Sequence, residues 1–263
     1  MKRQMALFSQ TRFTNPTVRP TAGKPGNPDL LKRSLWGAGL LLVAGGYVRM
    51  VRPRMARWGA ADDEVVGAMP GDGEVPEPDW MVTRAVSIAA PPEAVWPWIV
   101  QIGYHRAGWY AYDTFDNDDI PSAETILPEF QHLEIGQVLG EEGFAVREIE
   151  PTRHLVLAFH HPKTTWVVKQ GVWPLFGHCS MSLQLRPLLD GERTRFVYRV
   201  RFSAPRLGRL LFLPFFEPAD FFSSRRMLTG IKRRAESHYP GRVDAVQESL
   251  PSDRLSKRSL SAH

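Results

Sequence analysis

The residues with the greatest capacity for chemistry lie together in one short segment, between residues 105 and 116. It holds an imidazole, a guanidinium, phenols and carboxylates, carried by His105, Arg106, Trp109, Tyr110, Tyr112, Asp113 and Asp116. Such groups can donate and accept protons in general acid–base catalysis. The alternative is structural, with Arg106 and Asp113 forming an ion pair that organises the loop. The residue types alone leave both interpretations open.

Other groups of polar residues do not match metal or nucleotide motifs. The acidic cluster Asp113–Asp119 lacks the alternating positions and central glycine of a calcium loop. The pairs His160–His161 and His178–Cys179 are adjacent, which does not place two ligands on one side of a zinc ion. The sequence contains no nucleophile elbow, phosphate loop or dinucleotide fingerprint. We therefore expect no metal and no cofactor.

Aromatic residues are concentrated around the same segment. Seven of them fall within the 20 residues that end at Phe115, namely Trp96, Trp98, Tyr104, Trp109, Tyr110, Tyr112 and Phe115. Aromatic rings supply large contact areas, and tyrosine hydroxyls can orient a ligand. The density fits the wall of an apolar cavity, although an ordinary core would also account for it.

Hydrophobic periodicity predicts an antiparallel sheet followed by a long helix. A strand ends at Ile88, and a helix over Pro92–Gln101 is expected to be kinked or short, because Pro97 would clash with the carbonyl of Glu93. Further strands are predicted at Gly136–Leu139, Phe144–Ile149, Leu155–Phe159 and Thr165–Val172. A hairpin turning at Asp190–Gly191 alternates apolar and polar residues, which predicts one buried and one wet face. A helix is predicted from about Pro218 to His238.

Several short motifs resemble those of a known superfamily. They are APPEAVWPW (Ala90–Trp98), VQIG (Val100–Gly103), RAGWYAYD (Arg106–Asp113) and ILPEF (Ile126–Phe130). They are similar to the START-related superfamily, also called SRPBCC, in its polyketide cyclase and lipid-transport branch. The stretches Arg57–Val65 and Met69–Pro78 resemble the lead-in of its membrane-tethered, mostly uncharacterised members.

The resemblance implies an α+β helix-grip fold, in which a twisted antiparallel sheet of about seven strands wraps a long C-terminal helix around a cavity. It implies ligand contacts from Trp98, Arg106, Trp109, Tyr110, Tyr112, Trp166 and Phe222. In cyclase and dehydratase relatives, polar side chains of the cavity polarise a carbonyl group. Tyr110 and Asp113 would be the catalytic pair if this chain does the same.

The net charge of +5 is unevenly distributed along the chain. Residues 1–57 hold 11 Lys and Arg against the single acid Asp29, so the remainder of the chain is net negative. Basic residues flank the uncharged stretch Ser34–Val48, which favours an anionic membrane surface over nucleic acid as a partner. We expect a short single-pass anchor with the folded domain in the cytoplasm, although an interfacial or buried helix would also fit.

These patterns predict five segments. They are a disordered basic N-terminus (1–30), an anchor helix (31–52), a connector that acts as a spacer (53–79), a ligand-binding domain (80–239) and a disordered tail (240–263). The apolar run Leu210–Phe216 is either a membrane-dipping gate or an internal cap on the cavity.

The function expected from these observations is binding of a hydrophobic small molecule or lipid in the cavity. A cyclase- or dehydratase-like enzyme that uses the same cavity is the first alternative. The second alternative is a membrane-tethered protein-interaction module whose cavity is filled by its own aromatic side chains.

Overall fold

The computed structural model describes residues 28–140, 143–159, 177–188, 191–211 and 213–239. The chain divides into two compact units, residues 1–47 and residues 48–263. In the first unit the described helix is α1 (Pro28–Gly46), which covers residues 31–46 of the anchor helix predicted at 31–52. No helix in the described part of the chain is both long enough and apolar enough to cross a membrane.

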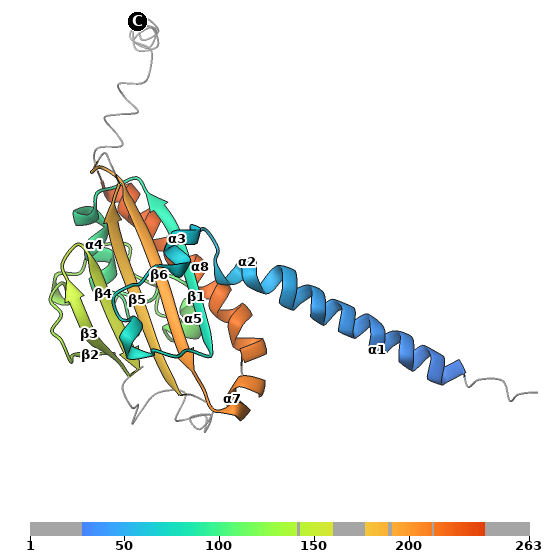
Figure 1. Cartoon of the computed structure of the whole chain (residues 1–263). Helices are drawn as coiled ribbons and strands as arrows, with labels where there is room; N and C mark the ends of the chain where they lie inside the picture. Colours follow the sequence, from blue (N-terminus) through green and yellow to red (C-terminus); the bar gives the residue numbers. More distant parts are fainter. Residues whose placement is uncertain (1–27, 141–142, 160–176, 189–190, 212, 240–263) are drawn as a thin grey trace, which may run out of the picture. The chain divides into compact units, whose positions relative to one another are not determined.

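The second unit is built around one antiparallel sheet (Figure 1). Its strands are β1 (Trp80–Ile88), β2 (Val138–Leu139), β3 (Phe144–Glu150), β4 (His154–Phe159), β5 (His178–Pro187) and β6 (Thr194–Ser203). They lie in the order β1-β6-β5-β4-β3-β2. The described residues thus form six strands where the sequence predicts about seven, and the predicted strand at 165–172 lies outside the described residues.

The shorter elements lie before β1, between β1 and β2, and after β6. They are η1 (Tyr47–Val51), α2 (Arg52–Ala56), α3 (Asp62–Val66), η2 (Asp72–Glu74), α4 (Pro92–Val100), α5 (Asp113–Asp116), η3 (Pro128–Phe130) and α7 (Arg206–Leu211). The predicted short helix is confirmed as α4, which contains Pro97 and ends at Val100.

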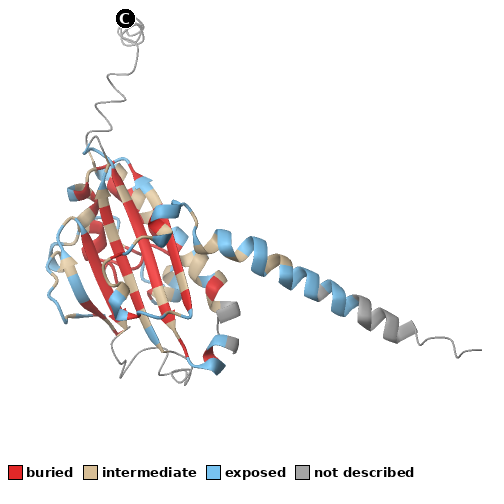
Figure 2. Cartoon of the chain, viewed as in Figure 1, coloured by how far each residue is buried: buried red, intermediate tan, exposed pale blue. Residues whose placement is uncertain are grey.

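The predicted hairpin is confirmed as β5 and β6. Their register pairs Met181 with Val200 and Leu183 with Tyr198, so these side chains share one face of the sheet. We call this the inner face. Buried residues concentrate on the sheet and on the elements that pack against it (Figure 2).

The long C-terminal helix, α8 (Leu213–His238), contacts β1 and α4. The predicted apolar stripe is buried at Leu228, Ile231 and Ala235, each at most 1% exposed. These residues join the main core with Trp98, Ile99 and others. A sheet that grips a long C-terminal helix is the helix-grip arrangement that the resemblance implies.

The opposite, outer face of the sheet was predicted to be wet, and this prediction is wrong near β6. Residues 57–79, which we call the outer strap, cross that face instead of acting as a spacer. Arg199 is 2% exposed and donates hydrogen bonds to the carbonyl oxygens of Glu64 and Gly67 at 2.6 and 2.9 Å. Arg195 pairs with the Glu64 carboxylate at 2.7 Å. These arginines of β6 therefore form hydrogen bonds with acceptors of the outer strap rather than with water.

Candidate functional site

Residues of the inner face and of α8 line a solvent-open pocket of about 340 Å³, which we call the inner pocket. Strands β3, β5 and β6 contribute Phe144, Met181 and Tyr198 to its wall, and the loop before α5 contributes Trp109. On α8 the wall residues follow a helical stripe, namely Phe216, Ala219, Asp220, Ser223, Ser224 and Met227. The volume lies within the range of small-molecule sites, and most of the lining is apolar.

A buried ion pair forms the polar part of this wall. Arg84 on β1 is 1% exposed, and its Nη1 donates to Asp220 Oδ2 and to Ser224 Oγ, each at 2.6 Å. Its Nε donates to the carbonyl oxygen of Met55 at 2.9 Å. Burial raises the pKa of the Asp220 carboxyl, and the Arg84 guanidinium opposes that shift. The pair ties α8 to β1 and places one charged group at the edge of an apolar space.

Burial raises the pKa of two further titratable groups of the inner face. Tyr198 faces Arg84 across the β1–β6 ladder, and burial raises the pKa of its phenol well above the usual value. Burial likewise raises the pKa of the Cys179 thiol to about 12. Tyr198 therefore carries its proton at neutral pH and can donate a hydrogen bond to a ligand in the inner pocket.

The pocket wall also contains an unsatisfied acceptor. Asp116 Oδ2 accepts a hydrogen bond from the Tyr112 N–H at 3.1 Å, whereas its buried Oδ1 has no partner among the described residues. Burial raises the pKa of this carboxyl. Because buried acceptors usually have partners, a ligand hydroxyl that reached Oδ1 would replace a missing hydrogen bond.

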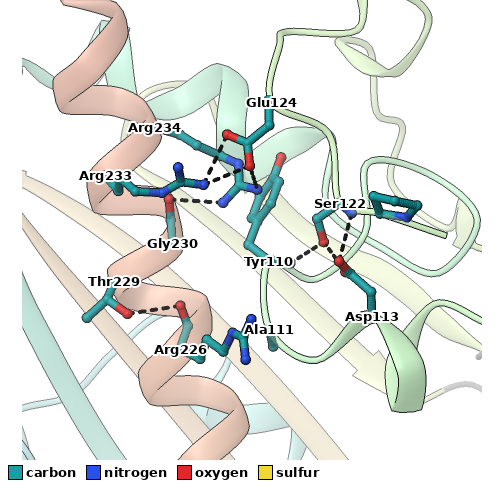
Figure 3. Close-up of a pocket in the computed structure, with 11 residues that line it drawn as sticks. Tyr110, Ala111, Asp113, Ser122, Glu124, Arg226, Thr229, Gly230, Arg233 and Arg234 are labelled. Carbon is teal, nitrogen blue, oxygen red and sulfur yellow. Dashed lines mark hydrogen bonds and ion pairs between the residues drawn. The ribbon is translucent and has the colours of Figure 1, made fainter. Parts of the chain in front are cut away.

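The predicted catalytic pair lies elsewhere. Tyr110 and Asp113 line a second depression of about 510 Å³, between the loop 110–124 and the C-terminal half of α8 (Figure 3). The Tyr110 hydroxyl accepts a hydrogen bond from Gln101 Nε2 at 2.8 Å, and Asp113 accepts from the backbone N–H and hydroxyl of Ser122. The two side chains thus hold the loop in place. The alternative Arg106–Asp113 ion pair is not formed, because Arg106 donates to the carbonyl oxygens of residues 100, 102 and 130.

The other predicted ligand contacts are dispersed. Trp109 lines the inner pocket, whereas Trp98 is completely buried in the core. The Tyr112 ring lies under the Arg226 guanidinium at 4.5 Å, and Phe222 is 54% exposed on α8. Trp166 and most of the predicted gate at 210–216 lie outside the residues whose side chains the structure describes, although Phe216 lines the inner pocket.

Sequence reasoning missed Arg84, Asp220 and Tyr198. A signal for Arg84 existed, because the alternation of β1 places it on the same face as Trp80, Val82 and Ile88. A charged side chain on the buried face of a strand needs a buried partner of opposite charge. Nothing in the sequence identifies that partner as Asp220.

This arrangement can hold an apolar molecule and hydrogen-bond a polar group on it. No cluster of three or more His, Cys, Asp or Glu side chains that could hold a metal ion occurs in the described ranges. The sheet order, the long C-terminal helix and the inner pocket define an α+β protein with a helix-grip fold.

Comparison with known proteins gives similarities at the level of solved structures. No protein-family model and no curated protein matches the chain. A protein from Mesorhizobium loti is 12% identical, over 60% of this chain and 98% of that chain, with a TM-score of 0.37. A protein from Nitrosomonas europaea is 12% identical, over 64% of this chain and 99% of that chain, with a TM-score of 0.37. The Zhui aromatase/cyclase from a Streptomyces species is 18% identical, over 60% of this chain and 93% of that chain, with a TM-score of 0.34.

Proposed function

We propose that this protein binds a hydrophobic small molecule or lipid in the inner pocket. The observation that carries the proposal is the pocket of about 340 Å³ between the sheet and α8, with a mainly apolar lining. A concave surface that is lined mainly by apolar side chains favours an apolar occupant.

The polar groups of the wall narrow the chemistry of that occupant. The Tyr198 phenol can donate a hydrogen bond, and Asp116 Oδ1, which has no partner in the described part of the chain, can accept one. A ligand with a largely apolar body and a hydroxyl or carbonyl group fits this wall. A ligand without any polar atom would leave Asp116 unsatisfied and bind less tightly.

A neutral fluorescent probe tests whether the pocket is open. N-phenyl-1-naphthylamine should bind the full chain with saturable fluorescence enhancement, and Ser223→Phe should weaken binding at least tenfold by filling the pocket with a ring. Thr229→Phe is the matched control, because it adds the same ring to α8 away from the inner pocket. Equal binding by both variants would count against the inner pocket as the site.

A cyclase- or dehydratase-like enzyme using the same pocket is the second candidate. The observation that favours it is the protonated Tyr198 phenol close to the Arg84–Asp220 pair, which could polarise a ligand carbonyl. Tyr198 would then take the role predicted for Tyr110 and Asp113. Tyr198→Phe should abolish turnover of a bound polyketide-like substrate with less than a threefold loss of affinity, and unchanged turnover would remove this candidate.

The interaction-module alternative has less support. It predicts a cavity packed solid by aromatic side chains, whereas Trp109 lines an open space and Phe222 is half exposed.

A further inference from the structure

The depression beside the C-terminal half of α8 is separate from the inner pocket and has the opposite character. We call it the arginine groove; it is lined by Tyr110, Ala111, Asp113, Pro121, Ser122, Glu124, Arg226, Thr229, Gly230, Arg233 and Arg234 (Figure 3). Its α8 residues follow their own helical stripe, two turns long, on a different face of the helix from the stripe that lines the inner pocket. One helix therefore serves two sites.

The acids of the groove are already engaged by the protein itself. Glu124 is bound by Arg233 at 2.7 and 3.0 Å and by Arg234 at 2.7 Å. The Asp113 carboxylate accepts hydrogen bonds from the backbone N–H and the hydroxyl of Ser122. Three guanidinium groups thus face two carboxylates, which leaves the groove with an excess of positive charge.

Arg226 supplies the charge that is available to a ligand, although its guanidinium also opposes the rise in the pKa of the Asp116 carboxyl that burial causes. Within the described ranges no carboxylate lies at ion-pair distance from its guanidinium, which is stacked on the Tyr112 ring at 4.5 Å. Stacking fixes the plane of a guanidinium and leaves its N–H groups at the edge available for an oxyanion. Arg233 is seven residues further along α8, about 10 Å along the helix axis, and nearly on the same side.

The floor of the groove is rigid. Arg234 is 5% exposed, donates to the carbonyl oxygen of Ala123 at 2.8 Å and lies over the Tyr110 ring at 4.4 Å. A Cβ at Gly230 would lie 2.8 Å from the Tyr110 carbonyl oxygen, so glycine permits this close approach of the loop to α8. A binding surface that is held in place loses little entropy when a ligand arrives.

We propose that the arginine groove binds an organic oxyanion, a phosphate or carboxylate group, between Arg226 and the Arg233–Glu124 pair. Guanidinium groups bind these anions through paired hydrogen bonds. The Arg233–Glu124 pair is solvent-exposed, with side chains 63% and 60% exposed, so an incoming anion can displace Glu124 from Arg233. This site goes beyond the binding function proposed for the inner pocket and does not depend on it.

Calorimetric titration of the full chain at constant ionic strength tests the site with inorganic phosphate, citrate and phosphatidylcholine vesicles that contain phosphatidic acid. Arg226→Gln should weaken the binding of at least one probe tenfold or more. Arg225→Gln is the matched control, since it removes the same charge one residue away and outside the groove, and it should change binding less than twofold. Binding of phosphate or citrate assigns the site to a soluble anion, whereas binding of the vesicles alone assigns it to a lipid headgroup.

A second variant predicts the opposite change. Glu124→Gln removes the internal competitor and should tighten anion binding at least threefold, while Arg234 keeps its bonds to the carbonyl oxygens of Ala123 and Gly230. Absence of binding by every probe, equal weakening in Arg225→Gln and Arg226→Gln, or weaker binding in Glu124→Gln would each overturn the proposal. Failure of the naphthylamine probe would leave these results unchanged, so the two sites are tested separately.

Discussion

Replacement of Arg84 by Met should destabilise the protein strongly and in a pH-dependent way. Met fills much of the space of Arg84 but leaves the Asp220 carboxylate, 11% exposed, without its 2.6 Å partner. Removing one member of a buried ion pair typically costs about 3–5 kcal/mol. The carbonyl oxygen of Met55 also loses its donor, whereas Ser224 keeps a bond to the carbonyl oxygen of Asp220 at 2.7 Å.

The magnitude can be bounded, because an unpaired Asp220 takes up a proton rather than remain charged. The carboxyl has an ordinary pKa of 3.8. Protonating it at pH 7 in the folded state costs about 1.4 kcal/mol for each pH unit above that value, or about 4 kcal/mol in total. A folded-state pKa raised above the unfolded value destabilises the protein only as pH rises above 3.8. Because burial already raises the pKa of Asp220 in the wild type, the pH-dependent part of the cost of Arg84→Met should be at most about 4 kcal/mol at pH 7 and should shrink toward zero close to pH 4, where only the cost of the lost Met55 hydrogen bond remains.

Urea denaturation followed by tryptophan fluorescence, at several pH values between 4 and 7, measures this difference. The double variant Arg84→Met/Asp220→Asn is the control, because it has no carboxyl at this position and should lose most of the pH dependence. A deficit below 1 kcal/mol at pH 7, or a deficit equal at pH 4 and pH 7, would show that Arg84 and Asp220 are not coupled as described.

Three further predictions concern the strap, a glycine and the thiol. Arg199→Met should lower the free energy of unfolding by about 3 kcal/mol, since it leaves the carbonyl oxygens of Glu64 and Gly67 in the outer strap without their donor. A loss below 1 kcal/mol in urea denaturation would contradict these contacts. Gly59→Ala should cost at least about 2 kcal/mol in urea denaturation, because Gly59 has φ 72° and a Cβ there would overlap the Ala85 carbonyl oxygen. Gly73 lies in open space, so Gly73→Ala should be neutral in the same assay. Burial raises the pKa of the Cys179 thiol to about 12. The thiol should therefore react with Ellman's reagent at pH 8 at least about 100-fold more slowly in the native protein than in urea, because the thiolate is the reactive form. Similar rates in the two conditions would show an accessible thiol.

The sheet and its helix could be predicted because their signals are local. Alternation over Met181–Leu185 and Phe196–Phe202 identifies the hairpin, and the spacing of Leu228, Ile231 and Ala235 identifies the buried side of α8. The role of the outer strap could not be predicted in this way. The arginines of β6 have the pattern of a solvent-facing row, and only the tertiary structure brings strap carbonyl oxygens over them.

The polar residues in the wall of the inner pocket could not be predicted from the sequence for a related reason. Arg84 and Asp220 are separated by 136 residues, and their pairing depends on where α8 crosses the sheet. Tyr110 and Trp109 are adjacent, yet they face the arginine groove and the inner pocket respectively. Composition identified this segment as important but could not divide its residues between two sites. Attachment of the chain to a membrane stays a prediction.

Native mass spectrometry of the full chain, with organic extraction of co-purifying molecules, tests the central claim most directly. We expect an added mass from an apolar molecule that carries a hydroxyl or carbonyl group, present in the wild type and in Thr229→Phe and absent from Ser223→Phe. An unliganded mass in all three proteins, unchanged after incubation with lipid and polyketide extracts, would contradict the binding function.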